Sequence, residues 1–396
     1  MSGKCIILGA GASFGYDETI PKEERAPKGI DLLSKALENG LLTKYKYPNF
    51  IDLLEQYAYT MGKDNKTYSD IDIEEFLEKV VLAFESARKL ASGESIVGEE
   101  ELNKLIDPIR LLFKKLYEET QSDYDPRRPA KTNNLRSVKL QSAIGEATFL
   151  IWELLKIYTL RYRTTFDSYQ RLALYHLEEP FNLISLNYDA IFEMAAMQSG
   201  LNIQYSGTPA IDPFLIGMKR IINVAKVHGS VNWFNLYSKG IAVGGAEKGY
   251  SLLHRVSNLF YTNHINTGPP IIVNPTALFQ IDINHLLMSG DQYYEPVIIP
   301  PIGKNKDYEK VVYFKTNWEA AGNMVANSNE IILIGVSLRE QDTRLRDLLA
   351  NRAKKGLEAT VVGSESSLAA LKTILGKKLK GEPRFIGNFS SFAKNL

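Results

Sequence analysis

Short apolar runs that end in glycine, asparagine or histidine constrain the fold of this chain more than any other feature. Residues 5–8 run into Gly9, and residues 181–186 run into Asn187. A third run ends at His228, which a glycine follows at once. Continuous apolar runs of this length are typical of strands that are buried on both faces. We read these runs as strands, the third of them at 222–227, and predict further strands at 296–299, 330–334 and 358–362.

Helical patterns separate several of these strands, notably at 187–198 and 318–326. The alternation of strand and helix predicts a Rossmann-like α/β fold, in which a parallel sheet carries helices on both faces. In open sheets of this kind, ligands bind at the carboxyl ends of the strands. The residues that follow the strands are therefore the candidates for a functional site, and together they favour a dinucleotide ligand.

The block of residues 31–179 differs from the rest because it shows helical periodicity and little strand signal. Asp72 and Glu75 predict the start of one long helix as a capping pair, and a second long helix is predicted over about 140–158. Since one strand precedes the block, we predict an all-helical insertion at 31–179 within one α/β domain made of 1–30 and 180–396. Residues 235–295 lack a clear period, and either a flap over the site or a small subdomain fits them.

The composition excludes several classes of protein. The chain has 396 residues with a net charge of +1, so it has no strong global field for nucleic acid or for a membrane surface. Its single cysteine, Cys5, excludes a disulfide framework and any cysteine-rich zinc site. The first strand begins almost at Met1, which leaves no room for a signal peptide, and no apolar stretch is long enough to cross a bilayer. We therefore expect a cytoplasmic protein without a metal centre.

The first strand leads into a glycine-rich segment, Gly9-Ala10-Gly11-Ala12-Ser13. Glycine permits a tight turn and lets backbone N–H groups approach a pyrophosphate closely. The segment is not the usual dinucleotide fingerprint, since Phe14 stands where the third glycine belongs. A phosphate cradle and an ordinary turn both remain open for it on the sequence alone.

Three further strand exits carry polar or small residues. Asn187 and Asp189 flank a tyrosine after the strand at 181–186, where they suit either a ligand site or the cap of the following helix. His228 suits either catalysis or a structural hydrogen bond. Gly335 and Ser337 follow the strand at 330–334 and suit either a ribose contact or an ordinary loop.

These four segments, in this order, resemble the SIR2 (sirtuin) superfamily. The glycine segment from Gly9 resembles its phosphate loop, and Asn187-Tyr188-Asp189 resembles its Asn-x-Asp motif. Lys226-Val227-His228-Gly229-Ser230 resembles its catalytic His-Gly motif, and Gly335-Val336-Ser337-Leu338 resembles its ribose loop. The resemblance covers residues 1 to about 30 and about 180 to 365.

The departures from that family are informative. Deacylating sirtuins carry a zinc module with four cysteines, which a chain with one cysteine cannot build. The segment that follows the phosphate loop in those enzymes is also missing here. The pattern is closer to the SIR2-like proteins of bacterial anti-phage systems, in which a helical insertion replaces the zinc module. That resemblance implies hydrolysis of NAD, as the substrate, to nicotinamide and ADP-ribose, in defence by abortive infection.

The resemblance also implies a role for each site residue. Asn187 would orient the water and the nicotinamide ribose, His228 would be the general base, and Asp189 would bind the nicotinamide amide or the ribose. Residues Gly9, Ala10, Gly11, Ala12 and Ser13 would hold the pyrophosphate, and Gly335 and Ser337 the adenosine ribose. Because an unregulated NAD hydrolase harms its own cell, we expect gating by a homo-oligomer or by a neighbour-encoded ATPase or nuclease.

Two other functions stay open on the sequence. One is transfer of ADP-ribose or NAD-dependent deacylation, in which a protein nucleophile replaces water. The other is a nucleotide-binding regulatory subunit of a defence complex that has no turnover. No direct contact with nucleic acid or a membrane is expected in any of these cases.

Overall fold

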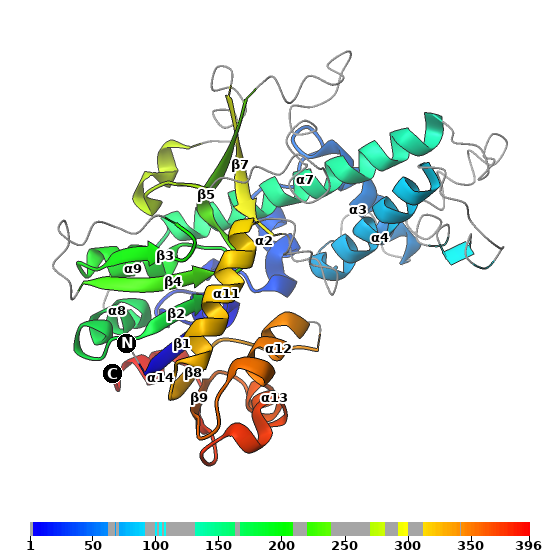
Figure 1. The fold of residues 1–396 in the computed structure, drawn as a ribbon. Helices are drawn as coiled ribbons and strands as arrows, with labels where there is room; N and C mark the ends of the chain where they lie inside the picture. Colours follow the sequence, from blue (N-terminus) through cyan, green and yellow to red (C-terminus); the bar gives the residue numbers. More distant parts are fainter. Residues whose placement is uncertain are drawn as a thin grey trace.

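A computed structural model describes residues 3–61, 68, 71–91, 100, 103–104, 107, 131–162, 167–208, 220–238, 270–281, 292–299, 312–340 and 342–396. Figure 1 shows the arrangement of its elements. The strands are β1 (Lys4–Leu8), β2 (Asn182–Ser185), β3 (Asn202–Tyr205), β4 (Ile221–Lys226), β5 (Gly229–Ser238), β6 (Ile271–Ile272), β7 (Gln292–Ile298), β8 (Glu330–Ile334), β9 (Glu358–Val362) and β10 (Arg384–Ile386). The α-helices are α1 (Ala10–Phe14), α2 (Leu32–Glu38), α3 (Pro48–Thr60), α4 (Ile73–Ala91), α7 (Lys131–Leu160), α8 (Ser168–Glu178), α9 (Ile191–Gln198), α11 (Val312–Ala326), α12 (Thr343–Arg352), α13 (Glu365–Leu375) and α14 (Phe389–Ala393). Short 3₁₀ helices are η1 (Lys22–Glu24), η2 (Gly29–Asp31), η7 (Pro275–Gln280) and η9 (Gly376–Lys378).

Seven strands form one parallel sheet in the order β10-β9-β8-β1-β2-β4-β3. Starting from β1, the chain adds β2 and β4 on one side and then crosses over to add β8, β9 and β10 on the other. This is the strand order of a Rossmann-like sheet, with β3 as an extra edge strand, and it confirms the predicted α/β fold. The direction of winding reverses between β1 and β8, so the crevice for a ligand is expected at the carboxyl ends of these two strands.

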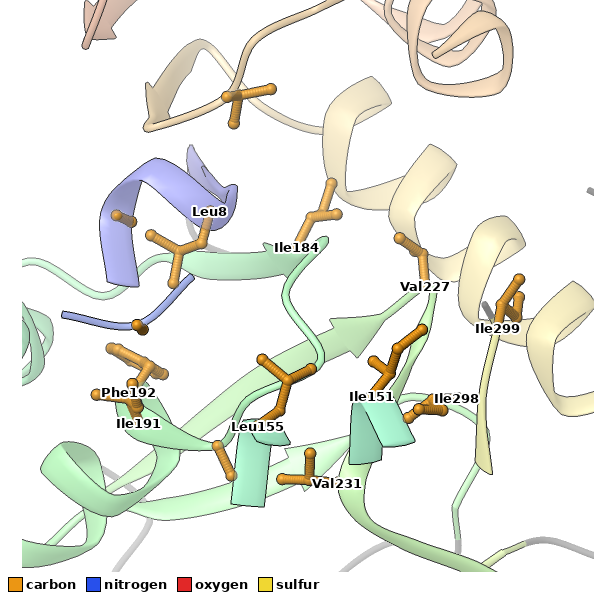
Figure 2. Packing of buried hydrophobic residues seen from close by; sticks show 14 of the residues in the cluster. Leu8, Ile151, Leu155, Ile184, Ile191, Phe192, Val227, Val231, Ile298 and Ile299 are labelled. Atoms are coloured by element: carbon orange, nitrogen blue, oxygen red, sulfur yellow. The ribbon is translucent and has the colours of Figure 1, made fainter. Parts of the chain in front are cut away.

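Two layers of helices cover this sheet, as Figure 1 shows. The helices α11, α12 and α13 pack against one another in one layer, and α8, α9 and α14 form the other. The central strands β1 and β8 are apolar and buried after their first residue, because both of their faces are covered. Figure 2 shows how the core continues to the exits of the strands, where Leu8, Ile184 and Val227 lie in one cluster with Ile191 and Phe192 of α9.

A second, antiparallel sheet in the order β6-β5-β7 follows the exit of β4. The strand predicted at 296–299 overlaps β7, but it belongs to this sheet and not to the parallel one, which corrects the sequence interpretation. The second sheet packs on α7, where the Trp152 indole N–H donates to the Val231 carbonyl at 2.8 Å. Much of 235–295 lies outside the described residues, so the expectation of a flap or subdomain stays open.

Helices α2, α3 and α4 pack on the long helix α7, which also contacts β5 and β7. Asp72 begins α4 as predicted, since its side chain accepts from the Glu74 N–H at 2.8 Å. Glu75 does not complete a capping box in this way; its carboxylate accepts from Lys79 at 2.7 Å. The assignment of 31–179 as a separate inserted domain stays a prediction. Among the described residues, no helix is both long enough and apolar enough to span a membrane.

Glu146 lies fully buried where α7 meets α3. Its carboxylate accepts from the Asn49 amide at 2.7 Å and from the Phe50 backbone N–H at 2.8 Å, and so caps the start of α3. Burial raises the pKa of Glu146 from 4.5 to about 7, although these two hydrogen bonds oppose the rise. The folded protein therefore favours the protonated carboxyl.

Glu146→Gln is expected to remove part of the pH dependence of stability. Because the folded pKa lies above the unfolded one, the wild type loses stability between about pH 4.5 and 7, by about 3 kcal/mol from this group. Glutamine stays neutral, and the Asn49 amide can turn to accept from it. The gain in stability of the variant over the wild type should therefore grow from about pH 4.5 to about pH 7 and level off above it, which thermal unfolding between about pH 4 and 8 measures.

Glu75→Gln is the matched control for this experiment. Its hydrogen bond with Lys79 lowers the pKa of Glu75, so the pH dependence from this residue has the opposite sign. Parallel pH profiles for the wild type and Glu146→Gln would contradict the interpretation of Glu146.

Candidate active site

Ser13 joins the exits of β1 and β2 through three buried hydrogen bonds. Its Oγ donates to Asp189 Oδ2 at 2.8 Å and accepts from Asn187 Nδ2 at 2.9 Å. The third bond, at 2.9 Å, is to the Tyr169 hydroxyl of α8. Because the single Ser13 proton goes to Asp189, the Tyr169 hydroxyl must be the donor. Burial and the nearby Asp189 carboxylate raise the pKa of Tyr169 well above its ordinary value, so its phenol keeps that proton.

This network sets the orientation of the Asn187 amide. Since Nδ2 donates to Ser13, Oδ1 points the other way, and it has no hydrogen-bond partner among the described residues. The side chain is only 6% exposed. A buried acceptor without a partner costs free energy and is uncommon in native proteins. Asn187 Oδ1 is therefore the atom at this site where a donor from a ligand is most needed.

Asp189 makes its contacts within the protein. One carboxylate oxygen accepts from Ser13, and the other accepts from the Ile191 N–H at 3.1 Å, at the start of α9. Ala190, and not Asp189, is the N-cap residue of α9 and makes no side-chain cap, but the Asp189 carboxylate still satisfies the first N–H of this helix. Through Ser13, Asp189 also determines which way the Asn187 amide points.

His228 is half-buried at the exit of β4 and contacts the same loop. Its Nδ1 lies 3.1 Å from the carbonyl oxygen of Leu186, the residue before Asn187. A carbonyl only accepts, so Nδ1 carries the proton, and the neutral ring has its lone pair on Nε2. The rings of Tyr188 and Trp318 lie near the imidazole, with centroids 5.9 Å and 6.0 Å from its own. The structure therefore holds His228 against the backbone of the residue that precedes Asn187, with Nε2 as the basic atom.

The glycine after His228 has a steric cause. Gly229 has φ +84°, and a Cβ there would lie 2.0 Å from the Val297 carbonyl oxygen. Only glycine allows β5 to pass so close to β7. The Ile299 N–H then donates to the His228 carbonyl at 2.9 Å, which fixes the backbone of the histidine against the second sheet.

The glycines after β1 and β8 bring two loops into backbone contact. The Gly9 N–H donates to the Ile334 carbonyl at 2.9 Å, and the Gly11 N–H donates to the Gly335 carbonyl at 3.1 Å. A Cβ at Gly335, which has φ +64°, would lie 2.0 Å from the Ala12 nitrogen. The sequence interpretation assigned Gly9 and Gly11 to a pyrophosphate and Gly335 to the adenosine ribose. In the structure these glycines permit the two segments to meet at the point where the sheet reverses.

The predicted site residues thus fall into three groups. Ser13, Asn187 and Asp189 share one hydrogen-bond network, with His228 attached through Leu186. Gly9, Gly11 and Ala12 meet Gly335 as described. Ala10 is exposed at the start of α1, and Ser337 is exposed on the loop after β8.

Sequence reasoning missed Tyr169, and it assigned no role to Lys226. Tyr169 lies on α8, far from Ser13 along the chain, and nothing in its local sequence marks it. Lys226 is the first residue of the histidine motif, and it is fully buried, which is rare for lysine and could have drawn attention only in the structure. In the part of the chain that is described, no three His, Cys, Asp or Glu residues lie together so as to hold a metal ion.

Comparison with known proteins gives matches among solved structures alone. No protein-family model matches the chain, and no curated protein matches it. One similar structure is a Sir2 homologue in complex with NAD, with 13% identity and a TM-score of 0.32, covering 62% of this chain and 69% of that one. Another is a mutant Sir2 homologue in complex with ADP-ribose, with 14% identity and a TM-score of 0.32, covering 62% and 71%. A third, from work on the mechanism and regulation of Sir2 enzymes, has 13% identity and a TM-score of 0.31 and covers 80% and 99%.

Proposed function

We propose that this protein hydrolyses NAD at the N-glycosidic bond and releases nicotinamide and ADP-ribose. The observation that carries the proposal is the buried Asn187 Oδ1, which has no partner among the described residues. The amide nitrogen of the same side chain belongs to the Ser13 network, and His228 contacts the carbonyl of the preceding residue, Leu186. A hydroxyl of the nicotinamide ribose, or the attacking water, would supply the missing donor. The sheet supports the proposal, because its reversal point is where such folds take up a dinucleotide.

Hydrolysis of NAD requires few protein groups beyond these. The pyridinium leaves as neutral nicotinamide, so the leaving group needs no general acid, in contrast to an O-glycoside. The site has to hold the ribose in a reactive pose, stabilise a cationic centre and orient a nucleophile. In this proposal Asn187 Oδ1 orients the ribose and the water, and His228 Nε2 takes the proton of the water. The Asp189 carboxylate contributes negative charge and holds Ser13.

The rest of the dinucleotide would lie along the two contacting loops. Gly9 and the first residues of α1, up to Ser13, would bind the pyrophosphate, and the loop of Gly335 and Ser337 would bind the adenosine ribose. Ion pairing between Arg339 on the second loop and Glu74 of α4, at 2.6 Å, ties this loop to the helical block. A change in the helical block would therefore reach the nucleotide loop directly.

That connection supports a regulated enzyme. We place the activity in anti-phage defence by abortive infection, where oligomerisation or a neighbour-encoded ATPase or nuclease would open the site. Deacylation fits the chain less well, because its single cysteine cannot form a zinc module of the deacylase kind.

Incubation of the purified chain with NAD, followed by chromatography, tests the proposal. We expect equimolar nicotinamide and ADP-ribose, and loss of product formation in His228→Ala. Light scattering on the same samples relates turnover to oligomeric state, and the neighbour-encoded protein is added in a parallel series. Intact NAD in every assembly state would overturn the proposal. Tight binding of ADP-ribose without product would favour a regulatory subunit, and label from NAD on protein would favour transfer.

A further inference from the structure

Lys226 ends β4, and its side chain is 0% exposed. Its ammonium donates to the Asp189 carbonyl oxygen at 2.5 Å and pairs with Glu193 Oε1 of α9 at 2.9 Å. Burial raises the pKa of Glu193, and the nearby Lys226 opposes that rise. A fully buried lysine has a large desolvation cost, so its presence at this position needs an explanation.

The geometry explains the buried lysine by its contact with the loop that carries Asn187. Two side chains from the exit of β4 bind the two ends of this loop: His228 contacts the Leu186 carbonyl, and Lys226 contacts the Asp189 carbonyl. Between them, the Val231 N–H donates to the Tyr188 carbonyl at 2.8 Å. The backbone on both sides of Asn187 is therefore held from the same strand exit.

We infer that Lys226 is a positioning residue, which holds the Asp189 end of the loop so that Asn187 Oδ1 and His228 keep a fixed relation to each other. The expected effect of Lys226 on kcat rests on the proposed function, whereas its expected effect on the backbone of the loop does not. Lys226 itself lies beneath the loop and makes no contact with the reacting atoms in this scheme. Its effect should therefore appear in kcat more than in the KM for NAD.

Two variants distinguish a positioning role of Lys226 from a purely stabilising one, because they are expected to change kcat and the melting temperature in opposite ways. Lys226→Met with Glu193→Leu removes both charges, and replacing a buried ion pair by apolar groups is often neutral or stabilising. We expect this double variant to keep its melting temperature within a few degrees and to lose roughly 10- to 100-fold in kcat. Glu193→Gln leaves the Lys226 ammonium on the Asp189 carbonyl, and we expect a lower melting temperature with kcat within threefold of the wild type.

Hydrogen exchange gives a readout that does not depend on turnover. In the double variant the peptide covering 186–191 and the Val231 amide should exchange faster than in the wild type, and in Glu193→Gln they should not. Unchanged exchange and kcat in the double variant would overturn the inference, as would an equal loss of kcat in Glu193→Gln. If the wild type leaves NAD intact, the proposed function fails, and the exchange comparison alone decides the role of Lys226.

Discussion

Asn187→Ala is expected to lower kcat for NAD cleavage by roughly 100- to 1,000-fold, the effect of removing one well-placed polar group from a reacting centre. The protein should remain as stable as the wild type, within about 1 kcal/mol, or become slightly more stable. The reason is that the variant loses one hydrogen bond to Ser13 but also loses a buried acceptor that has no partner among the described residues. Single-turnover kinetics and denaturant unfolding on the same preparation measure both effects.

Asn274→Ala is the matched control for Asn187→Ala. Asn274 Oδ1 caps the 3₁₀ helix η7 by accepting from the Thr276 N–H at 2.9 Å. Its loss should cost about 1 kcal/mol of stability and leave kcat unchanged, the opposite pattern. Full activity in Asn187→Ala would show that the orphaned oxygen has no part in the chemistry.

Gly335→Ala is expected to cause a large loss of stability, because Gly335 lies where the segments after β1 and β8 touch. The new Cβ would lie 2.0 Å from the Ala12 nitrogen and 2.3 Å from the Gly11 carbonyl carbon, both of which are backbone atoms. The loops after β1 and β8 would have to separate, and the residue would also sit at φ +64°. We expect a loss of more than about 4 kcal/mol, or failure to fold, in equilibrium unfolding.

Gly356→Ala isolates the part of this cost that comes from backbone conformation alone. Gly356 has φ +78°, and a Cβ there would meet nothing within 4 Å. Its substitution should cost about 1–2 kcal/mol. Equal losses in the two variants would mean that the loops can move apart freely and that their contact is not required by the fold.

The central strands were predictable because they are buried on both faces. Residues 330–334 and 358–362 match β8 and β9 to the residue, since a covered strand is mostly apolar. The edge strands β3 and β10 were missed for the opposite reason. Asn202 and Arg384 are exposed. A strand that pairs with a single neighbouring strand and has one face in solvent shows no distinctive composition.

The candidate site was predictable where it follows strand exits and not where it depends on packing between distant segments. The residues that were predicted from their place after a strand are Ser13, Asn187, Asp189 and His228. Tyr169 reaches Ser13 from another layer, and only the folded chain shows that its proton is donated there. The direction of these hydrogen bonds, and with it the orientation of the Asn187 amide, has no signal in the sequence at all.

The strand that bears the glycine loop lies in the middle of the sheet, between β2 and β8. Residues 4–8 therefore pair with residues 330–334, across almost the whole length of the chain. Pairing over such separations is slow because a very long loop has to close first. During translation, β1 has to wait for β8 to leave the ribosome before the Gly9 and Gly335 loops can meet. Under the proposed function, the two segments that would bind NAD therefore come together only after most of the chain has been synthesised.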